Sequence, residues 1–275
     1  MSAPFPAPDR RTARRRFERA ASTYTAASRL EAEVGARMLE RLDYVKLAPR
    51  RILDAGSGPP QRVLKKRYPK ADIVALDFSL EMLRSARTWR DRFRRNLSVC
   101  ADLERLPLAP GSVDLVWSNM ALHWLADPPA ALKEIERVLA PEGLLMFSTL
   151  GPDTLKELRA AAGTGRVHAF YDMHDVGDML VAAGFSAPVM DMEMLTIAYP
   201  GPDGLLADLR ASGQTSARAD RPRGLAGKGF AARLRGALAA SASFEVVYGH
   251  AWKRAARAEN ADETAKTVRV FKRMP

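Results

Sequence analysis

The sequence predicts an α/β fold in which a mostly parallel, doubly wound sheet carries helices on both faces. An apolar stretch at residues 52–53 is followed by a glycine turn and a helical stretch, and a second apolar stretch at residues 73–76 follows that helix. Strand and helix patterns then alternate up to residue 149. Because parallel strands need long crossover connections that are usually helical, this alternation favours a parallel sheet.

The turn after the first strand contains Gly56 and Gly58, spaced by one residue. Glycine has no Cβ, so the chain can turn sharply there and a ligand can lie against bare backbone. The second strand ends at Asp77. In doubly wound sheets an acid at this position binds the two ribose hydroxyls of a nucleotide-type ligand.

The motif differs from the dinucleotide fingerprint G-x-G-x-x-G, because the third glycine is absent and Pro59-Pro60 stiffens the turn. Asp54 also directly precedes the glycine turn. Its charge would repel a phosphate at the helix N-terminus, whereas it suits a ligand with a cationic end. The first strand therefore favours a positively charged nucleoside over a dinucleotide.

The N-terminal segment predicts two amphipathic helices, at residues 10–24 and 28–42. The first carries six arginines beside an apolar stripe that includes Phe17 and Tyr24. Since both helices precede the first strand, we expect them to lie over the carboxyl edge of the sheet as a lid. The alternative is that the stripe only packs on the core and that the arginines form a solvated face.

The middle of the chain supplies the next elements. A helix at residues 61–68 follows the glycine turn, and Ser79 caps a helix at residues 79–89. The elements expected after it are strands at 97–100 and 113–119, a helix at 128–139 that ends at the Pro141–Gly143 stretch, and a strand at 144–149.

The C-terminal half predicts an antiparallel strand pair at the sheet edge. The remaining expected elements are a helix capped by Asp153 or Thr154, a helix at 171–180 ended by Gly184, strands at 189–199 and 244–252, a helix at 202–211 and a mobile stretch at 212–229. We therefore divide the chain into a helical lid (residues 1–44), a main domain (45–253) and a charged tail (254–275).

Composition limits the class of protein. A chain of 275 residues, 47% of them hydrophobic, can bury one large core with a small appendage. The chain contains no run of ~18 apolar residues that could span a membrane. It also lacks the apolar stretch that follows the N-terminal basic residues in a secretory signal. The single Cys100 suits a reducing cytoplasm, and four scattered histidines predict no metal site. The net charge of +11 is compatible with nucleic acid, an acidic protein partner or arginine-rich codon usage.

Polar and aromatic residues follow the fourth strand, where ligands bind in such sheets. Asn119, His123 and Trp124 are therefore candidates for the substrate side of the site. A packing role is the alternative for the histidine and the tryptophan.

The glycine turn together with the acids resembles the S-adenosylmethionine (SAM) pocket of the Rossmann-like class I methyltransferases. This resemblance implies that an apolar residue after Asp77 packs on the adenine, and that Asp102 and the next backbone N–H bind the adenine edge. The implied cofactor-binding residues are Asp54, Gly56, Gly58, Asp77, Phe78, Met82, Asp102, Leu103 and Asn119.

Further blocks make the resemblance more specific and cover residues 10–253. They are Arg16-Phe17-x-x-Ala20-Ala21-x-x-Tyr24, Asn119-x-x-Leu122-His123-Trp124, the stretch from Phe147 to Arg159, Asp172-Met173-His174-Asp175-x-Gly177-Asp178, and the stretch from Glu245 to Trp252. Together they resemble the malonyl-[acyl-carrier protein] O-methyltransferases of biotin synthesis. The resemblance implies a seven-stranded, mostly parallel sheet with an antiparallel edge strand, SAM as the cofactor, and an acidic carrier protein as the partner.

The implied reaction needs little chemistry from the protein. A malonyl carboxylate is ionised at pH 7, so no general base is required, and catalysis consists of alignment and partial desolvation. We expect Tyr24, His123 and Arg159 to surround the malonyl group. We also expect a cytoplasmic monomer that binds neither metal nor nucleic acid.

Three alternatives stay open. Assembly factors of respiratory complex I share the Leu-His-Trp region and are thought to hydroxylate a protein arginine. An RNA methyltransferase would use the basic charge, but Asn119-Met120-Ala121 lacks the aromatic corner of nucleobase N-methyltransferases, and Cys100 is far from the position of a cytosine C5 nucleophile. A SAM-binding module without activity is the third.

Overall fold

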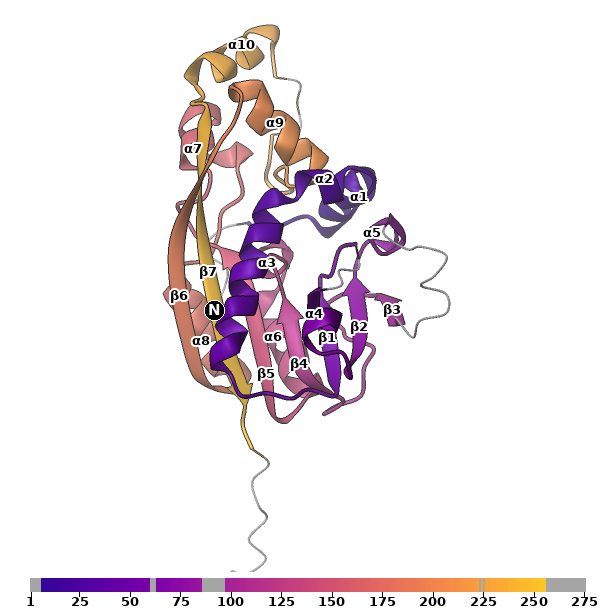
Figure 1. Ribbon diagram of the computed structural model, residues 1–275. Coiled ribbons are helices and arrows are strands. Elements are labelled where there is room, and N and C mark those ends of the chain that lie inside the picture. Colours follow the sequence, from indigo (N-terminus) through magenta and orange to yellow (C-terminus); the bar gives the residue numbers. More distant parts are fainter. Residues whose placement is uncertain (1–5, 60–62, 86–96, 223, 225, 256–275) are drawn as a thin grey trace, which may run out of the picture.

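A seven-stranded mixed sheet forms the centre of the computed structural model, which describes residues 6–59, 63–85, 97–222, 224 and 226–255 (Figure 1). The strand order is β3-β2-β1-β4-β5-β7-β6. The strands are β1 (Arg51–Ala55), β2 (Asp72–Asp77), β3 (Leu97–Cys100), β4 (Val113–Ser118), β5 (Leu139–Leu150), β6 (Phe185–Ala198) and β7 (Ser241–Lys253). The predicted α/β class is confirmed.

Strands β1 to β5 pair with one another in parallel. Strand β7 runs antiparallel to both β5 and the edge strand β6. The antiparallel pair expected at the edge is therefore present, and both of its strands are longer than predicted. Their extra length carries them past the carboxyl ends of the neighbouring strands (Figure 1).

Helices cover both faces of the sheet. Helices α3 (Arg29–Arg41) and α4 (Val63–Arg67) pack on one face, and α6 (Pro128–Val138) and α8 (Met173–Ala183) on the other. The strands are buried on both sides, with successive side chains in opposite clusters: Ile52 packs with Met38 of α3, and Leu53 packs with Leu132 of α6.

The two N-terminal helices of the sequence analysis have different places. Helix α1 (Arg10–Ala20) and the short α2 (Tyr24–Ala27) lie at the carboxyl ends of β1 and β2, where a lid was expected (Figure 1). Helix α3 instead packs on the sheet face through Leu30, Val34 and Met38. Its apolar stripe is long enough to cover strands, which places it in the core layer and not over the edge.

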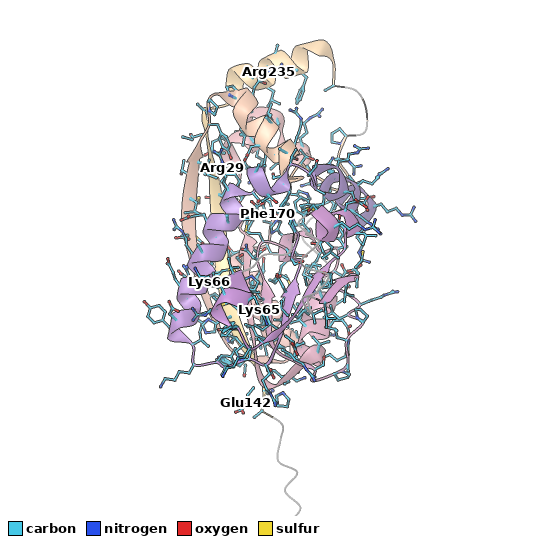
Figure 2. The ribbon with its side chains drawn as sticks, turned by 45° about the vertical axis from the view of Figure 1, so that its right-hand side comes forward. Arg29, Lys65, Lys66, Glu142, Phe170 and Arg235 are labelled. Carbon is cyan, nitrogen blue, oxygen red and sulfur yellow. The ribbon has the colours of Figure 1, made fainter. Side chains whose placement is uncertain are left out.

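Strand β5 begins earlier than predicted. Helix α6 ends at Val138 and the strand starts at Leu139, so the Pro141–Gly143 stretch lies inside β5. It forms a bulge there, because Val113 pairs with Leu139 but Leu115 pairs with Leu144. Glu142 takes a positive φ of 61° in this bulge, at the end of the molecule opposite Arg235 (Figure 2).

A further helical layer stands beyond the carboxyl ends of the sheet, against the long part of β6 and β7 (Figure 1). It contains α7 (Lys156–Ala162), α9 (Pro202–Ala211) and α10 (Lys228–Ala237). The sequence analysis did not predict α10. It also expected residues 212–229 to be mobile, whereas Ala217 is buried, its N–H donates to His168 Nε2 and its carbonyl oxygen accepts from the Asp9 N–H.

Helix α7 starts differently from the prediction that Asp153 or Thr154 caps it. Its N-cap is Leu155, with a left-handed φ of 54°. The Thr154 hydroxyl instead donates to the Glu245 carbonyl oxygen, and Asp153 lies 3.9 Å from Lys156.

Other predicted helix ends are confirmed. Ser79 Oγ accepts from the Met82 N–H at the start of α5 (Leu80–Ser85), and Gly184 ends α8 with a φ of 105°. Pro60 and residues 256–275 of the expected tail lie outside the described residues. None of the described helices is long and apolar enough to cross a membrane.

Candidate functional site

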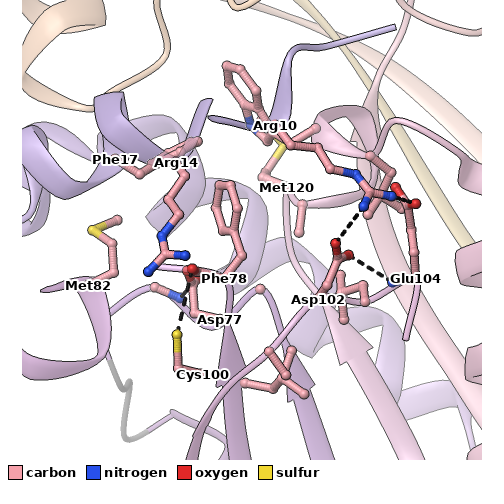
Figure 3. Close-up of a pocket in the computed structure, with 18 of the residues that line it drawn as sticks. Arg10, Arg14, Phe17, Asp77, Phe78, Met82, Cys100, Asp102, Glu104 and Met120 are labelled. Atoms are coloured by element: carbon pink, nitrogen blue, oxygen red, sulfur yellow. Dashed lines mark hydrogen bonds and ion pairs between the residues drawn. The ribbon is translucent and has the colours of Figure 1, made fainter. Parts of the chain in front are cut away.

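A cavity of about 320 Å³ opens at the carboxyl ends of β1, β2 and β4, beneath α1 (Figure 3). Its volume is in the range of small-molecule sites, and its place is the one at which doubly wound sheets bind ligands. The predicted residues that line it are Tyr24, Gly56, Gly58, Asp77, Phe78, Met82, Asp102, Leu103 and Asn119. Arg10, Arg11, Arg14, Phe17 and Trp124 line it as well.

The glycine turn presents bare backbone to this cavity. Gly58 has a φ of 57°, and a Cβ on it would lie 3.6 Å from the Tyr24 ring and 3.7 Å from the Met82 methyl group. Gly56 has a φ of 74°, and a Cβ on it would lie 2.3 Å from the Ala121 Cβ. Both positions favour glycine because of their positive φ, and at Gly56 an added Cβ would also clash with Ala121.

Asp77 is held in a fixed orientation at the end of β2. Its Oδ2 accepts from the Gly58 N–H at 2.9 Å and its Oδ1 accepts from the Ser79 N–H at 2.8 Å. Burial raises the pKa of the carboxyl to about 6, although the two backbone donors act in the opposite direction. A carboxylate oxygen has two lone pairs, so both oxygens can also accept from adjacent hydroxyls of a ligand.

Asp54 is buried next to the glycine turn and does not line the main cavity. It borders a second cavity of about 160 Å³, which shares Tyr24, Gly56 and Asn119 with the first. Burial, and then the charge of Asp77, raise the pKa of Asp54 to about 7.

Glu31 of α3 borders the same second cavity, and the sequence analysis did not identify it. Burial raises its pKa to about 7, and its carboxylate accepts from the Gln214 amide. The signal in the sequence is its position: Glu31 lies three residues before Val34 and seven before Met38, on the buried stripe of the helix.

The three buried acids give the site its electrostatic character. None of Asp54, Asp77 and Glu31 forms an ion pair with another described residue. Their raised pKa values show that the free protein holds these charges at a cost. A cationic ligand would supply the missing counter-charge.

The outer end of the cavity is formed by Phe78, Met82, Asp102 and Leu103. Asp102 lies between α1 and the loop after β3: its Oδ2 is 3.0 Å from the Arg10 guanidinium, and its Oδ1 accepts from the Glu104 N–H (Figure 3). The flat, apolar surfaces beside an acceptor suit a purine-like ring.

Asn119 supports the cavity wall. Its Nδ2 donates to the Glu31 carbonyl oxygen at 2.8 Å, and its Oδ1 accepts from the Ser148 hydroxyl at 2.9 Å. These bonds join α3 to β5 across the end of β4.

Aromatic rings form the roof. The Phe17 ring centroid of α1 lies 5.0 Å from that of Trp124 and 5.8 Å from that of Phe78. Tyr24 lies beside them, and burial, followed by the charges of Glu31 and Asp77, raises the pKa of its hydroxyl well above the usual value. The tyrosine therefore remains a neutral donor at physiological pH.

Besides Asp54, two further predicted residues do not line the main cavity. His123 lines neighbouring cavities, behind Trp124. The Arg159 guanidinium donates to the carbonyl oxygens of Pro152, at 2.7 Å, and Thr154, at 3.0 Å. Arg159 thus stabilises the turn before α7, and it lines neither the main cavity nor the neighbouring ones that contain His123 or Asp54.

Metal-binding geometry is absent from the part of the chain that the structure describes: no group of three or more His, Cys, Asp or Glu side chains could hold an ion there.

Comparisons with known proteins identify relatives over almost the whole chain. Residues 53–147 match the family model described as a methyltransferase domain. The chain is 50% identical to the malonyl-[acyl-carrier protein] O-methyltransferase of Methylovorus sp. (strain MP688), with 90% of each chain covered. It is 49% identical to the protein of the same name from Gallionella capsiferriformans (strain ES-2), with 96% of this chain and 97% of the relative covered.

Among solved structures, the YcgJ protein of Bacillus subtilis is similar, with a TM-score of 0.59 and 18% identity over 80% of this chain and 98% of that one. At this identity the likeness supports the fold alone.

Proposed function

The chain belongs to the malonyl-[acyl-carrier protein] O-methyltransferase family, and we propose on this basis that it transfers a methyl group from SAM to the free carboxylate of malonyl-acyl carrier protein. The product is the malonyl methyl ester with which pimeloyl and biotin synthesis begins. The observation that carries the proposal is the identity of about half of all residues with relatives of this name over nine tenths of each chain. The residues that line the main cavity support the same activity.

The residues around the cavity fit SAM. Asp77 offers two oriented acceptors for the ribose hydroxyls, and Phe78 with Met82 offers apolar surface for the adenine. Asp102 and the Leu103 backbone suit the adenine edge. Asp54 and Glu31 supply negative charge beside the cavity, as the sulfonium and amino groups require. When bound, SAM supplies an activated methyl group.

The protein's part in the reaction is to desolvate and align the acceptor. The malonyl carboxylate is ionised at pH 7, so the chain needs no general base. The Phe17 and Trp124 rings exclude water from the roof of the cavity. The neutral Tyr24 hydroxyl can donate one hydrogen bond to the carboxylate, which orients it without the full charge of an ion pair.

We also propose a division of the chain into a lid and a catalytic domain. We assign α1 and α2, within residues 1–44, to a lid that closes over the methyl donor, and residues 45–253 to the methyltransferase domain. The contacts of Phe17 and the ion pair between Arg10 and Asp102 support the lid.

The partner is an acyl carrier protein, whose acidic surface suits the arginines of α1. Arg11, Arg14, Arg15 and Arg19 are exposed on that helix, and charge complementarity of this kind speeds association.

We place the reaction in the cytoplasm and the enzyme in a monomeric state. The complex I assembly factors and nucleic-acid methyltransferases are not favoured by the relatives found.

The test is incubation of the protein with SAM and malonyl-carrier protein, followed by intact mass measurement of the carrier. The expected result is one added methyl group, which alkaline hydrolysis removes because the product is an ester. Methyl transfer to RNA, or no transfer to any carrier-bound diacid, would contradict the proposal.

A further inference from the structure

A third cavity, of about 170 Å³, lies on the other side of Trp124 from the main cavity. Helices α7, α9 and α10 enclose it together with the end of β5 and part of β7. Its walls are mostly apolar, with Leu155, Leu158, Leu206, Leu209 and Phe244 among them. Because Trp124 lines both spaces, the two cavities meet at this side chain.

Two residues in the walls each carry a buried polar atom that has no hydrogen-bond partner. These atoms are Nε2 of His123 and Oγ of Ser216. Only five side-chain atoms among the described residues are buried without a partner, and two of the five belong to this cavity. Unpaired buried polar groups are rare because each one costs stability, so two of them at one cavity indicate a ligand that completes them.

Both atoms are able to donate. Burial, and then the charge of His168, lower the pKa of His123 to about 3, so the imidazole is neutral and carries one N–H. Its Nδ1 lies 3.5 Å from the Thr149 hydroxyl, which can donate to that nitrogen and leave the proton on Nε2. The Ser216 hydroxyl is a donor in any rotamer. Two residues of the wall therefore carry unused donors, and a turn of each side chain would bring its donor to acceptor oxygens in the cavity.

Two cations also belong to its walls. Arg166 lies with its guanidinium carbon 4.2 Å from the Phe230 ring centroid of α10, and Arg210 is exposed on α9. Neither forms an ion pair with a described carboxylate, in contrast to Arg235 of α10, which pairs with Asp203. Figure 2 shows Arg235 on the outer side of α10 and Phe170, which also lines the cavity, in the interior.

We propose that this cavity is the subsite for the thioester end of a pantetheine-linked acyl substrate, with His123 and Ser216 donating to its carbonyl oxygens. The inference rests on the proposed function and adds the place of the acyl arm. A pantetheine arm carries amide and thioester carbonyls on an uncharged chain, and an anionic phosphodiester joins it to the carrier protein. Apolar walls suit its methylenes, the two unpaired donors suit its carbonyls, and Arg166 and Arg210 suit the phosphodiester. The malonyl carboxylate then passes Trp124 to reach the main cavity.

The first experiment removes the two donors and measures steady-state kinetics with malonyl-carrier protein and with malonyl-N-acetylcysteamine. Ser216→Ala and His123→Phe should each raise KM for both thioesters about 3- to 10-fold, the range of one lost hydrogen bond. His123→Gln should recover most of the affinity because its amide keeps a donor near Nε2. The matched control is Ser112→Ala, which removes another unpaired hydroxyl before β4, outside this cavity. The SAM Kd should stay the same in all four.

The second experiment separates the arm from the acyl group. Arg210→Ala should raise KM for malonyl-carrier protein but not for malonyl-N-acetylcysteamine, which has no phosphodiester. Ala162→Phe fills the cavity from partly exposed α7 and should abolish turnover of both thioesters while SAM binding persists.

The outcomes distinguish the two proposals. Wild-type KM values in His123→Phe and Ser216→Ala, or normal turnover in Ala162→Phe, would overturn the subsite while the methyltransferase function stands. A wild-type enzyme that methylates no malonyl thioester would remove the proposed function, and the subsite with it.

Discussion

The Asp77 carboxylate accepts a hydrogen bond from the backbone N–H of Gly58 at 2.9 Å, which joins the acid that ends β2 to the glycine turn that follows β1. The other carboxylate oxygen accepts from the Ser79 N–H that precedes α5. One side chain thus shapes the turn and offers acceptors to the ligand. A variant at this position therefore reports on both roles, and its test must measure both.

Asp77→Asn should weaken SAM binding by about 1–3 kcal/mol, because the amide nitrogen replaces one of the two acceptors for the ribose hydroxyls. Calorimetric titration with SAM measures the loss, and thermal unfolding without SAM measures the part that belongs to the turn. Asp72→Asn, at the exposed start of the same strand, is the control. Unchanged SAM affinity in Asp77→Asn would remove the ribose assignment.

Gly56→Ala should destabilise the protein and abolish SAM binding. The new methyl group would lie 2.3 Å from the Ala121 Cβ, and the φ of 74° is unfavourable for alanine. Overpacking of this kind costs about 1–3 kcal/mol and the left-handed conformation about 1–2 kcal/mol. Urea unfolding measures the sum.

The control for Gly56→Ala is Gly177→Ala in α8, where the added Cβ would lie 3.9 Å from the Met190 side chain, an ordinary contact. It should stabilise the helix by about 0.5–1 kcal/mol. Equal effects of the two substitutions would contradict the close approach at Gly56.

The sequence could predict the parallel sheet and the cofactor end of the site because both depend on local patterns. Gly56, Gly58 and Asp77 lie at the carboxyl ends of the first two strands, and these two strands pair directly in the sheet, so the three residues meet. The family resemblance then added Asp102 and Leu103, which line the same cavity.

The acyl side could not be predicted in the same way. Ser216 reaches its cavity through a loop that the sequence marked as mobile, and Phe230 through α10, which was not predicted. These positions depend on contacts between segments far apart in the chain, such as the Ala217 N–H donating to His168 Nε2. For Arg159 the prediction assigned a role that the structure does not support. Its charge suggested a contact with the substrate, but its guanidinium donates to backbone carbonyl oxygens.

SAM affinity should increase with pH up to about 7. Burial raises the pKa of Asp54 from 3.8 and that of Glu31 from 4.5, both to about 7, so both carboxyls are largely protonated in the free protein at about pH 5.5. A cationic ligand favours the ionised forms, and its binding releases protons. Calorimetry in two buffers of different ionisation enthalpy measures that release.

The free energy of unfolding of the free protein should change with pH in the opposite direction, decreasing as the pH rises. A carboxyl whose folded pKa is raised stabilises the fold fully below its unfolded pKa of about 4, and this contribution is lost as the pH rises through 7. Asp54→Asn should flatten both pH dependences, whereas Asp203→Asn on exposed α9 should change neither. A SAM affinity that does not vary between about pH 5.5 and 7 would contradict the role of these acids.

Deletion of residues 1–24 should abolish turnover and leave the sheet domain folded. The deletion removes Phe17 and Tyr24 from the roof of the cavity, while the packing of α3 on the sheet face does not depend on α1. Circular dichroism and a methyl-transfer assay measure the two properties. The single substitution Phe17→Ala should lower activity in the same direction, and Tyr44→Ala, at an exposed position after α3, should not. A fully active truncation would exclude the lid.

Arg159→Ala should reduce stability without changing the choice of acyl group. The guanidinium donates to the carbonyl oxygens of Pro152 and Thr154, and hydrogen bonds to a charged group contribute about 1.5–3 kcal/mol. Because the side chain faces this turn and not a cavity, kcat/KM for malonyl- and succinyl-carrier protein should fall by the same factor.

Butyryl-carrier protein should give no methylated product with the wild type or with Arg159→Ala, because it has no carboxylate to accept the methyl group. The matched control is Lys156→Ala, on the exposed side of the same helix, which should change neither stability nor kinetics. A malonyl-to-succinyl ratio that moves toward succinyl in Arg159→Ala alone would show that the arginine does hold the substrate carboxylate, and that the turn opens when the carrier binds.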